Sequence, residues 1–312
     1  MTAAPPFQVA VLMATYNGAE FLPRQLDSLA AQTHENWRLW VSDDGSADAT
    51  LDILRRRREA WGRDRLRLQR GPGRGFQANF LTLTARQDLN ADYFAWSDQD
   101  DIWLPEKLAR SLARLAPYGQ DEPALYCGRT VLMDSQGRDY GFSPLLNRRP
   151  PAFLNALLQN CGGGNTMVFN RPARELIIGG YPFDLCSHDW WAYQIVSGCG
   201  GRLIYDPEPL VRYRQHGKNL VGCNRGWRNR WNRLQRVLAG DWRRIVGLQL
   251  AALQKAAWRL TPENRRGLEN LLELRRCPNP FRRLRRFLAG GFHRQFRAEQ
   301  LAMGLAVFMG RV

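Results

Sequence analysis

"VAVLMATYNGAEFLPRQLDSLAAQTHENWRLWVSDDGSADATLDIL" (residues 9–54) alternates short apolar runs with helical patterns. The run at 8–14 predicts a buried strand, and the run at 37–46 predicts a second strand that ends in an acidic turn. Residues 19–31 carry apolar side chains at helical spacing, and residues 47–60 also have a helical pattern. Because strands and helices alternate, the sequence predicts an α/β fold whose mostly parallel sheet is flanked by helices on both faces.

The alternation continues along the chain and places three polar turns directly after predicted strands. Further strands are expected at 65–70 and 92–98, with helices at 76–89 and 104–115. The three turns are "TYNG" (15–18), "SDDGS" (42–46) and "SDQDD" (97–101). Since ligands bind beyond the carboxyl ends of strands in such sheets, we expect these turns to meet at one rim and form a binding site.

The composition favours a folded protein with a large core. The chain has 312 residues, 44% of them hydrophobic, and 11 tryptophans, enough for one large α/β domain or a domain with an appendage. Its six cysteines form no C-x-x-C pair, so we expect reduced, mostly buried thiols in a cytoplasmic protein. No basic start precedes a long apolar stretch, and no window reaches the ~18 apolar residues of a membrane span. We therefore expect neither a signal peptide nor a transmembrane helix.

Almost all of the excess positive charge lies in the last third of the chain. The net charge is +16, of which residues 1–218 contribute +1 and residues 219–312 contribute +15. This asymmetry predicts an α/β domain at 1–222 and a basic amphipathic helical region at 223–312. In the basic region arginines are interleaved with Trp227, Trp231, Trp242 and Trp258. One interpretation is a solvated helical face. We favour attachment to an anionic membrane surface, for which residues 279–292 are the strongest candidate.

The carboxylates of "WSDQDDIW" (96–103) call for a positive partner. Asp98, Asp100 and Asp101 follow an apolar run, where nearby like charges repel each other. A helix N-cap just before Leu104 would account for one or two of them. A divalent cation such as Mg²⁺ or Mn²⁺ binds one or two carboxylates and leaves its other positions to phosphate oxygens and water. We therefore favour a metal site.

The second acidic turn and a glycine-rich loop supply candidate nucleotide ligands. Asp43 and Asp44 are ordinary turn formers when taken alone. On the same rim as the acidic cluster, either could accept a hydrogen bond from a nucleobase N–H. "RGPGRGF" (70–76) contains a G-x-G, but it follows the third predicted strand, which argues against a dinucleotide fingerprint. Its glycines and Arg74 fit a loop that approaches a nucleotide closely.

Two histidine-containing segments complete the candidate site. In "SHDWW" (187–191), Asp189 is either the N-cap of the following helix or a general base that takes a proton from an attacking hydroxyl. In "YRQHG" (213–217), His216 is either a surface histidine or a metal ligand that closes the site from the opposite side. Residue type alone leaves both pairs of alternatives open.

The ordered set of motifs resembles inverting family 2 glycosyltransferases with the GT-A fold. The resemblance covers roughly residues 7–222 and rests on residues 9–54, "GRGFQANF" (73–80), "YFAWSDQDDIW" (93–103), "GGGNTMVFN" (162–170) and "SHDWWAYQIVSGCGGRLIYDPEPLVRYRQHGKNLVG" (187–222). It is most similar to the rhamnosyltransferase-like branch that builds bacterial surface polysaccharides such as O-antigen. The resemblance implies metal-dependent transfer of one sugar, favoured as L-rhamnose from dTDP-L-rhamnose, with a UDP-sugar as the alternative donor.

The resemblance also assigns roles to individual residues. It makes Asp189 the catalytic base. The donor-nucleotide side is matched by Thr15, Tyr16, Asn17, Glu20, Asp44 (or Asp43), Arg74 and Asp98. The acceptor or sugar side is matched by Gly164, Asn165, His188 and Trp190. The metal site, for Mg²⁺ or Mn²⁺, is matched by Asp100 and His216.

The resemblance implies partners and a location, and it leaves rivals from other classes. The chain has "RYRQH" where processive synthases carry Q-x-x-R-W, which argues for addition of one sugar. The expected acceptor is a glycan or a polyprenyl-linked acceptor that must be reached at the membrane, so the protein is expected on the inner face of the cytoplasmic membrane. A basic nucleic-acid-binding protein would need a recognition motif, which the sequence lacks, and would leave the acidic site unexplained. A nucleotide-binding scaffold without activity is disfavoured by the intact acidic residues.

Overall fold

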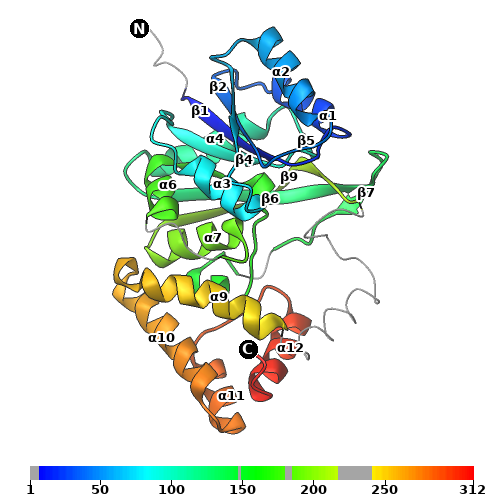
Figure 1. Cartoon of the computed structure of the whole chain (residues 1–312). Coiled ribbons are helices and arrows are strands. Elements are labelled where there is room, and N and C mark those ends of the chain that lie inside the picture. Colours follow the sequence, from blue (N-terminus) through cyan, green and yellow to red (C-terminus); the bar gives the residue numbers. More distant parts are fainter. Residues whose placement is uncertain (1–6, 147–148, 180–184, 217–240) are drawn as a thin grey trace.

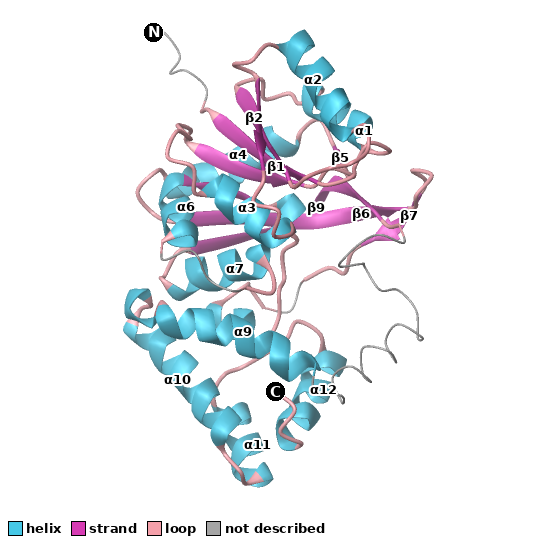
Figure 2. Ribbon diagram, in the orientation of Figure 1, coloured by secondary structure: helices cyan, strands magenta, loops and turns pink. Residues whose placement is uncertain are grey.

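The computed structural model describes residues 7–146, 149–179, 185–216 and 241–312. A sheet flanked by helices forms one part of the molecule, and a group of helices lies against its lower end (Figure 1). The described residues of this second part are helical and contain no strand (Figure 2). An α/β fold with a C-terminal helical region is therefore confirmed.

A nine-stranded sheet forms the centre of the fold. The strands are β1 (Val9–Thr15), β2 (Trp37–Asp43), β3 (Leu66–Arg70), β4 (Tyr93–Ser97), β5 (Ile102–Trp103), β6 (Ala124–Met133), β7 (Asp139–Phe142), β8 (Val168–Asn170) and β9 (Arg202–Arg214). They follow the order β3-β2-β1-β4-β8-β6-β9-β5, and β7 pairs with β6. The pairs β1–β2, β2–β3, β1–β4 and β6–β9 are parallel, whereas β8, β5 and β7 pair antiparallel to their neighbours.

The register of the parallel strands brings their carboxyl ends to one edge. Thr15 at the end of β1 lies opposite Asp43, and Asp43 in turn lies opposite Arg70 at the end of β3. Met13 lies opposite Ser97, the last residue of β4. The turns that leave β1, β2 and β4 therefore start side by side, as the sequence predicts.

Helices cover both faces of this sheet. They are α1 (Leu22–Ala30), α2 (Thr50–Trp61), α3 (Phe76–Thr84), α4 (Lys107–Leu115), α5 (Phe153–Ala156), α6 (Arg171–Ile178) and α7 (His188–Gly198). Side chains of β1 alternate between two cores: Val9 and Val11 pack with α1, α2 and α4, and Ala10 and Leu12 pack with α3, α6 and α7. This period of two is the pattern of a strand buried on both faces.

The C-terminal helices share the second of these cores. They are α9 (Asp241–Lys255), α10 (Pro262–Arg276), α11 (Pro280–Ala289) and α12 (Arg297–Phe308). Leu250, Leu271 and Phe287 belong to the same apolar cluster as Phe153 and Trp190 of the α/β part. The two predicted parts therefore have no separate cores among the described residues. Cys223, Trp227 and Trp231 lie outside the described residues, and so does the side chain of Trp242.

The structure also tests several local predictions, and some of them are wrong. The helix expected from residue 104 begins at Lys107, because the N–H of Leu104 still pairs with the Leu210 carbonyl beyond the end of β5, and its N-cap is Glu106. None of the three aspartates caps it, so the N-cap interpretation of the acidic cluster is wrong. The five described cysteines are free, but only Cys127 is buried and the others are half-buried. Within the described ranges, no helix is long and apolar enough to cross a bilayer.

Candidate active site

A cavity of about 1800 Å³ lies at the carboxyl edge of the parallel strands. Its wall takes residues from all three predicted turns and from the glycine-rich loop after β3. Residues 159–166, residues 187–189 and the start of α12 also line it. The prediction that the turns meet at one rim and form a concave site is therefore confirmed.

The turn after β1 is held in an unusual backbone conformation. Asn17 has a φ of 47°, the one left-handed non-glycine residue among the described residues. Its N–H donates to Ser46 Oγ at 2.8 Å, and its side-chain oxygen accepts from the N–H of Ala47 at 2.8 Å. The next N–H, of Gly18, donates to Thr50 Oγ1 at 2.8 Å. These bonds offset the strain of the left-handed residue and fix the turn that carries Tyr16.

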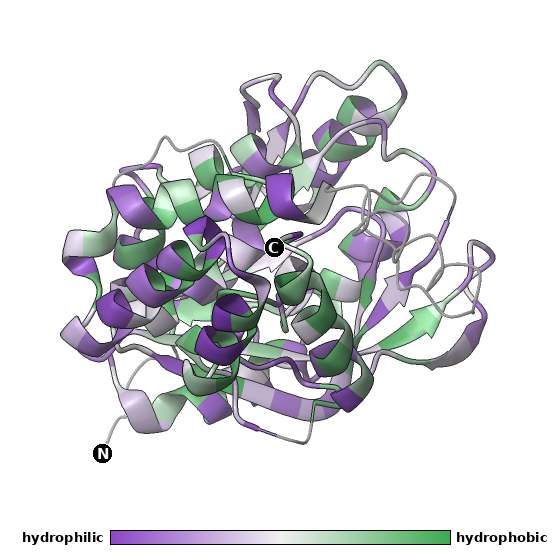
Figure 3. Cartoon of the chain, turned by 90° about the horizontal axis from the view of Figure 1, so that it is seen from below, coloured by the Kyte–Doolittle hydropathy of each residue, from purple (hydrophilic) through white to green (hydrophobic). Residues whose placement is uncertain are grey.

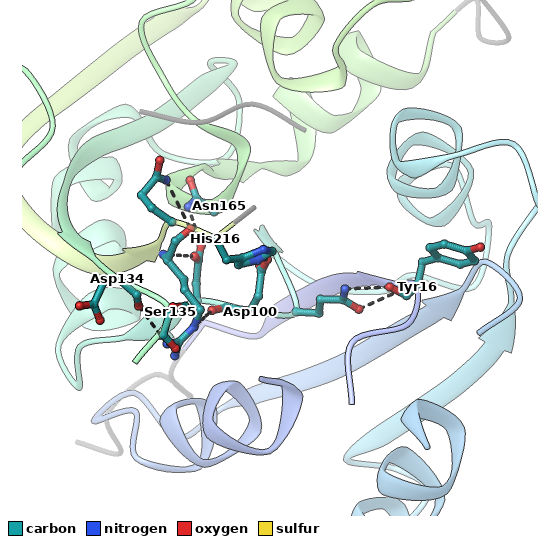
Figure 4. Close-up of polar contacts among 10 residues, drawn as sticks. Tyr16, Asp100, Asp134, Ser135, Asn165 and His216 are labelled. Carbon is teal, nitrogen blue, oxygen red and sulfur yellow. Dashed lines mark hydrogen bonds and ion pairs between the residues drawn. The ribbon is translucent and has the colours of Figure 1, made fainter. Parts of the chain in front are cut away.

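Gln99 joins the first turn to the third, a role that the sequence motifs did not predict. Its side-chain oxygen accepts from the N–H of Tyr16 at 2.9 Å, and its amide nitrogen donates to the Tyr16 carbonyl at 3.0 Å (Figure 4). A Cβ at Gly18 would overlap the Gln99 amide, so this bridge requires glycine there. The Tyr16 ring itself is exposed and lines the cavity.

The two aspartates of the second turn have different surroundings. Asp43 is buried, and its carboxylate accepts from Thr15 Oγ1 (2.8 Å), the N–H of Ser46 (2.8 Å) and Ser46 Oγ (2.6 Å). Asp44 lines the cavity, and its two oxygens accept from the N–H groups of Gly73 (2.6 Å) and Gly75 (2.8 Å). Asp43 therefore holds the turn together, whereas Asp44 anchors the glycine-rich loop at the cavity wall.

The donor set beside the third turn fits a divalent cation. Asp100 Oδ2 lies 2.8 Å from His216 Nε2, and both residues line the cavity. Neighbouring ligands of an octahedral ion, each about 2.1 Å from it, are about 3 Å apart. Carboxylate oxygen and imidazole nitrogen both suit Mn²⁺, and carboxylate suits Mg²⁺. Across the described segments, no group of three His, Cys, Asp or Glu side chains forms a complete metal cage, so phosphate oxygens and water would have to supply the other ligands.

The carboxylate of Asp98 is placed next to other negative charges. Burial and the charges of Asp100 and Asp189 raise the pKa of Asp98 to about 8. Asp98, Asp100 and Asp189 all line the same cavity. Without a compensating positive charge, the site disfavours the ionised form of Asp98. A bound cation would reverse that preference.

Asp101 is a support for the site and lies behind it. It is fully buried, and it accepts from Asn165 Nδ2 at 2.5 Å and from the N–H of Arg214 at 3.1 Å (Figure 4). The Arg214 guanidinium donates from Nε to the Asp100 carbonyl at 2.9 Å, and it also reaches the Ser135 carbonyl. These contacts tie the acidic turn to the end of β9, which carries His216. Asn165, predicted on the acceptor side, lines the cavity but uses its amide on Asp101.

Asp189 is oriented at the start of α7. One carboxylate oxygen accepts from the N–H of Gly164 at 3.1 Å, and the other accepts from Ser187 Oγ and from the N–H of Trp190 at 2.7 Å. Ser187 is the N-cap of α7, and Asp189 lies in its first turn. Gly164 can approach because it has no side chain: a Cβ there would lie 2.8 Å from His188 Nε2. The carboxylate is half-buried and lines the cavity.

Two residues that were predicted on the acceptor side are buried in the core. The His188 ring stacks on Phe80 at 4.4 Å and lies edge-on to Trp96, and neither ring nitrogen has a hydrogen-bond partner within the described part of the chain. Burial lowers the pKa of His188 to about 4, so the ring is neutral. The residue is only 4% exposed, although it belongs to the cavity lining. Trp190 is buried and donates to the Ala156 carbonyl at 2.6 Å, away from the cavity wall.

The other predicted donor-side residues lie around the rim. Thr15 and Glu20 line the cavity, although the Thr15 hydroxyl is committed to Asp43. Arg74 is exposed, and its neighbours Gly73 and Gly75 form the wall.

Residues of the C-terminal region also line the cavity. Phe296 and Glu299 line it together with Gln159. Glu299 accepts from Gln159 Nε2 at 3.2 Å and forms an ion pair with Arg294 at 3.1 Å. Arg294 also donates to the Leu158 carbonyl at 2.8 Å. The sequence motifs did not point to these residues, because the contact spans about half of the chain.

Comparison with known proteins places the chain in a family. Residues 10–177 match the sequence profile of the family described as Glycosyl transferase family 2. The dTDP-rhamnosyl transferase RfbG of Shigella flexneri is 29% identical over 237 residues, which cover 71% of this chain and 78% of that protein. An uncharacterized glycosyltransferase of Nostoc sp. is 32% identical over 227 residues, which cover 68% of this chain and 66% of that protein.

Solved structures share the fold at low sequence identity. The mannosyltransferase PcManGT of Pyrobaculum calidifontis, solved with GDP-Man and Mn²⁺, has a TM-score of 0.57 at 18% identity over 98% of this chain and 86% of that chain. Residues 1–349 of S. aureus TarS, solved with UDP-GlcNAc, have a TM-score of 0.52 at 16% identity over 78% of this chain and 66% of that chain. The fold is that of GT-A glycosyltransferases. Because the family profile covers more than half of the chain, this protein belongs to glycosyl transferase family 2 and is a glycosyltransferase.

Proposed function

We propose that the protein transfers one sugar from a nucleotide diphosphate donor to an acceptor hydroxyl with inversion at the anomeric carbon. The observation that carries this proposal is one cavity that contains an oriented carboxylate, Asp189, beside the acidic pair Asp98 and Asp100 with His216. A carboxylate that accepts two backbone N–H bonds is held in a fixed direction, as a general base requires.

The residues divide the reaction between them. Asp189 takes the proton of the acceptor hydroxyl as its oxygen forms a bond to the anomeric carbon. The bond from that carbon to the diphosphate oxygen breaks, and the electron pair leaves with the nucleoside diphosphate. A divalent cation, when bound by Asp100 and His216, supplies positive charge to the leaving diphosphate. Asp98 lies beside that pair, where its carboxylate can hold the ribose or the donor sugar.

The donor nucleotide is proposed to lie between the first two turns. The exposed Tyr16 ring offers a surface for stacking the base, and Asp44 at the cavity wall offers an acceptor for a base N–H. Asp43 is saturated by internal donors, which favours Asp44 of the two. dTDP-L-rhamnose is the favoured donor because of the similarity to the Shigella flexneri rhamnosyl transferase. A UDP-sugar is the alternative.

The acceptor is proposed to enter the cavity beside Phe296 and Glu299. An aromatic ring packs on the apolar face of a sugar, and a fixed carboxylate accepts from sugar hydroxyls. We propose a glycan on a polyprenyl lipid in the synthesis of a bacterial surface polysaccharide such as O-antigen. The enzyme would then work at the inner face of the cytoplasmic membrane, where its basic last third meets anionic lipid.

A turnover screen of nucleotide sugars tests the proposal. The purified protein is incubated with a bacterial lipid extract as the source of acceptor and with dTDP-L-rhamnose, UDP-sugars or GDP-sugars, in Mg²⁺, Mn²⁺ or EDTA, and release of the nucleoside diphosphate is measured. We expect release from dTDP-L-rhamnose that EDTA suppresses, and a loss of about 100-fold or more in Asp100→Ala. Turnover that is unchanged in EDTA and in Asp100→Ala would refute the metal site. Absence of turnover with every donor would refute the transfer itself.

A further inference from the structure

Helix α12 is apolar on its exposed face as well as on its buried face. Leu301, Leu305 and Met309 follow one another at four-residue spacing and are 76%, 55% and 40% exposed. On the opposite side Met303 and Val307 are buried in the core. In the view from below, the helix next to the C-terminus is coloured mainly as hydrophobic (Figure 3). From Leu301 onward α12 therefore leaves an apolar stripe exposed, and a contiguous exposed apolar patch marks an interaction surface.

Helix α11 extends this apolar surface. Phe281 and Leu288 are 73% and 68% exposed. The Phe281 ring lies edge-on to the Phe308 ring of α12, with 5.4 Å between the ring centroids. Leu284 reaches the backbone of α12 near Gly304. The exposed side chains of Phe281, Leu288, Leu301, Leu305 and Met309 are called the α11–α12 surface below.

The charge around this surface is mainly positive. Residues 241–312 contain 15 Lys and Arg and 5 Asp and Glu, a net charge of +10. Within α11 itself Arg282, Arg285 and Arg286 are exposed. Exposed aromatic and aliphatic side chains among arginines are the composition of helices that lie in the interface of anionic bilayers.

The α11–α12 surface lies partly on the helix whose first turn lines the cavity. Phe296, Ala298 and Glu299 belong to the cavity lining, and α12 starts at Arg297. Ala298 is exposed on the helix that carries the apolar stripe. A glycan that enters the cavity beside Phe296 and Glu299 could therefore stay attached to a lipid held in a bilayer at the α11–α12 surface.

We propose that the α11–α12 surface docks on the surface of an anionic lipid bilayer and thereby presents the cavity to lipid-linked acceptors. The docking stands on the exposed apolar side chains and the surrounding charge. Its role in reaching the acceptor rests on the proposed sugar transfer. This surface is more specific than the charge of the last third as a whole, because it names the side chains that enter the lipid.

Vesicle binding by surface variants of the full chain tests the proposal. The double variant Leu301→Glu, Leu305→Glu is compared with Trp258→Glu, whose indole is also 76% exposed but lies between α9 and α10. Binding to phosphatidylcholine vesicles is measured by co-sedimentation with and without phosphatidylglycerol. We expect the wild type and Trp258→Glu to bind the anionic vesicles alike, and the double variant to bind about tenfold or more weakly. Melting temperature and sedimentation velocity are measured for all three proteins.

Several results would overturn the docking surface. One is equal vesicle binding by the double variant and the wild type, and another is no preference for anionic vesicles. A change of oligomeric state in the double variant, with vesicle binding unchanged, would assign the surface to a second copy. A lower melting temperature with vesicle binding unchanged would assign it to another segment of this chain. A protein that binds vesicles but releases no nucleoside diphosphate would refute the proposed transfer and leave the docking surface intact.

Discussion

At the scale of single residues, Asp43 and Asp44 are neighbours with different tasks. We expect Asp43→Asn to lower the free energy of unfolding by about 2 kcal/mol, because its new amide group faces N–H and O–H donors in a buried turn. Asp44→Asn should lower it by about 1 kcal/mol, because its amide also faces an N–H group, of Gly73 or Gly75, but at a half-buried position on the cavity wall; it should weaken nucleotide binding about tenfold.

Urea unfolding and titration calorimetry with dTDP and UDP separate the two effects, and each variant serves as the control for the other. The assignment of Asp44 to the nucleotide is contradicted if Asp44→Asn binds both nucleotides as tightly as the wild type. It is also contradicted if Asp43→Asn loses more nucleotide affinity than Asp44→Asn under conditions in which both variants are fully folded.

The free energy of unfolding is expected to depend on pH through His188. Burial among aromatic rings lowers its pKa to about 4, below the 6.5 of an exposed histidine. Because only the unfolded chain takes up this proton between those values, the contribution is complete above pH 6.5 and is lost as the pH falls towards 4. The loss is about 3 kcal/mol. We expect His188→Leu to remove this part of the dependence, measured as the free energy of unfolding at several pH values.

Carboxyl groups, among them Asp98 with its raised pKa, also make stability depend on pH in this window, so the difference between the wild type and the variant is the informative quantity. If wild type and His188→Leu lose stability in parallel between pH 6.5 and 4.5, His188 is not buried as a neutral ring.

The sequence predicted residues whose position follows from local structure. The turns around Thr15, Asp44 and Asp100 each follow a strand directly, so parallel pairing places them together. The bridge by Gln99 and the support by Asp101 depend on contacts with distant segments. No local pattern distinguishes them from solvated or capping side chains.

At the scale of elements, side chains at the start of α12 are expected to affect the binding of the acceptor and not the reaction of the donor. Glu299→Gln removes the charge that pairs with Arg294, and Phe296→Ala removes the ring at the cavity wall. We expect each variant to raise the KM for the acceptor about tenfold, while hydrolysis of the donor by water stays unchanged. The measurement uses the acceptor on which the wild type shows turnover.

Glu273→Gln is the matched control for Glu299→Gln. Glu273 forms an ion pair with Arg286 at 2.9 Å in the same helical region, away from the cavity wall. If both glutamate variants change the acceptor KM equally, the effect comes from the charge of the region and the proposed place of the acceptor is wrong.

Element boundaries differed from the sequence prediction where tertiary pairing overrode local periodicity. The pattern from residue 104 is helical, yet Ile102 and Trp103 pair with β9 and Leu104 donates to the Leu210 carbonyl. The antiparallel strand β8, inserted between β4 and β6, is only three residues long. Its neighbours could not be read from sequence, because strand order is a property of the whole sheet.

At the scale of the whole molecule, the C-terminal helices are part of the fold. They share one apolar cluster with α7 and α5, and Leu260 packs where Gly198 leaves room for it. We expect the full chain to unfold in one cooperative transition, and a chain cut after residue 222 to lose that transition, because the cut exposes the buried partners of α9 to α12. Calorimetry and near-ultraviolet circular dichroism measure both.

The charge asymmetry predicted two distinct parts and could not show that they share a core, because charge reflects the surface of a region and carries no information about its buried side. A cut chain that melts cooperatively within about 5 °C of the full chain would show that the α/β part folds without the helices. The substitutions on the α11–α12 surface are the better test of membrane binding for this reason, since they leave the shared core in place.

The central claim, that Asp189 is the base of a single displacement in this cavity, is tested most directly by Asp189→Asn. The measurement is kcat with saturating donor and acceptor, together with the Kd for the nucleotide. The variant keeps the size of the side chain and removes its ability to take a proton. We predict that kcat falls about 10²- to 10⁴-fold while the nucleotide Kd changes less than about twofold. An unchanged kcat in a variant that binds the nucleotide normally would contradict the account.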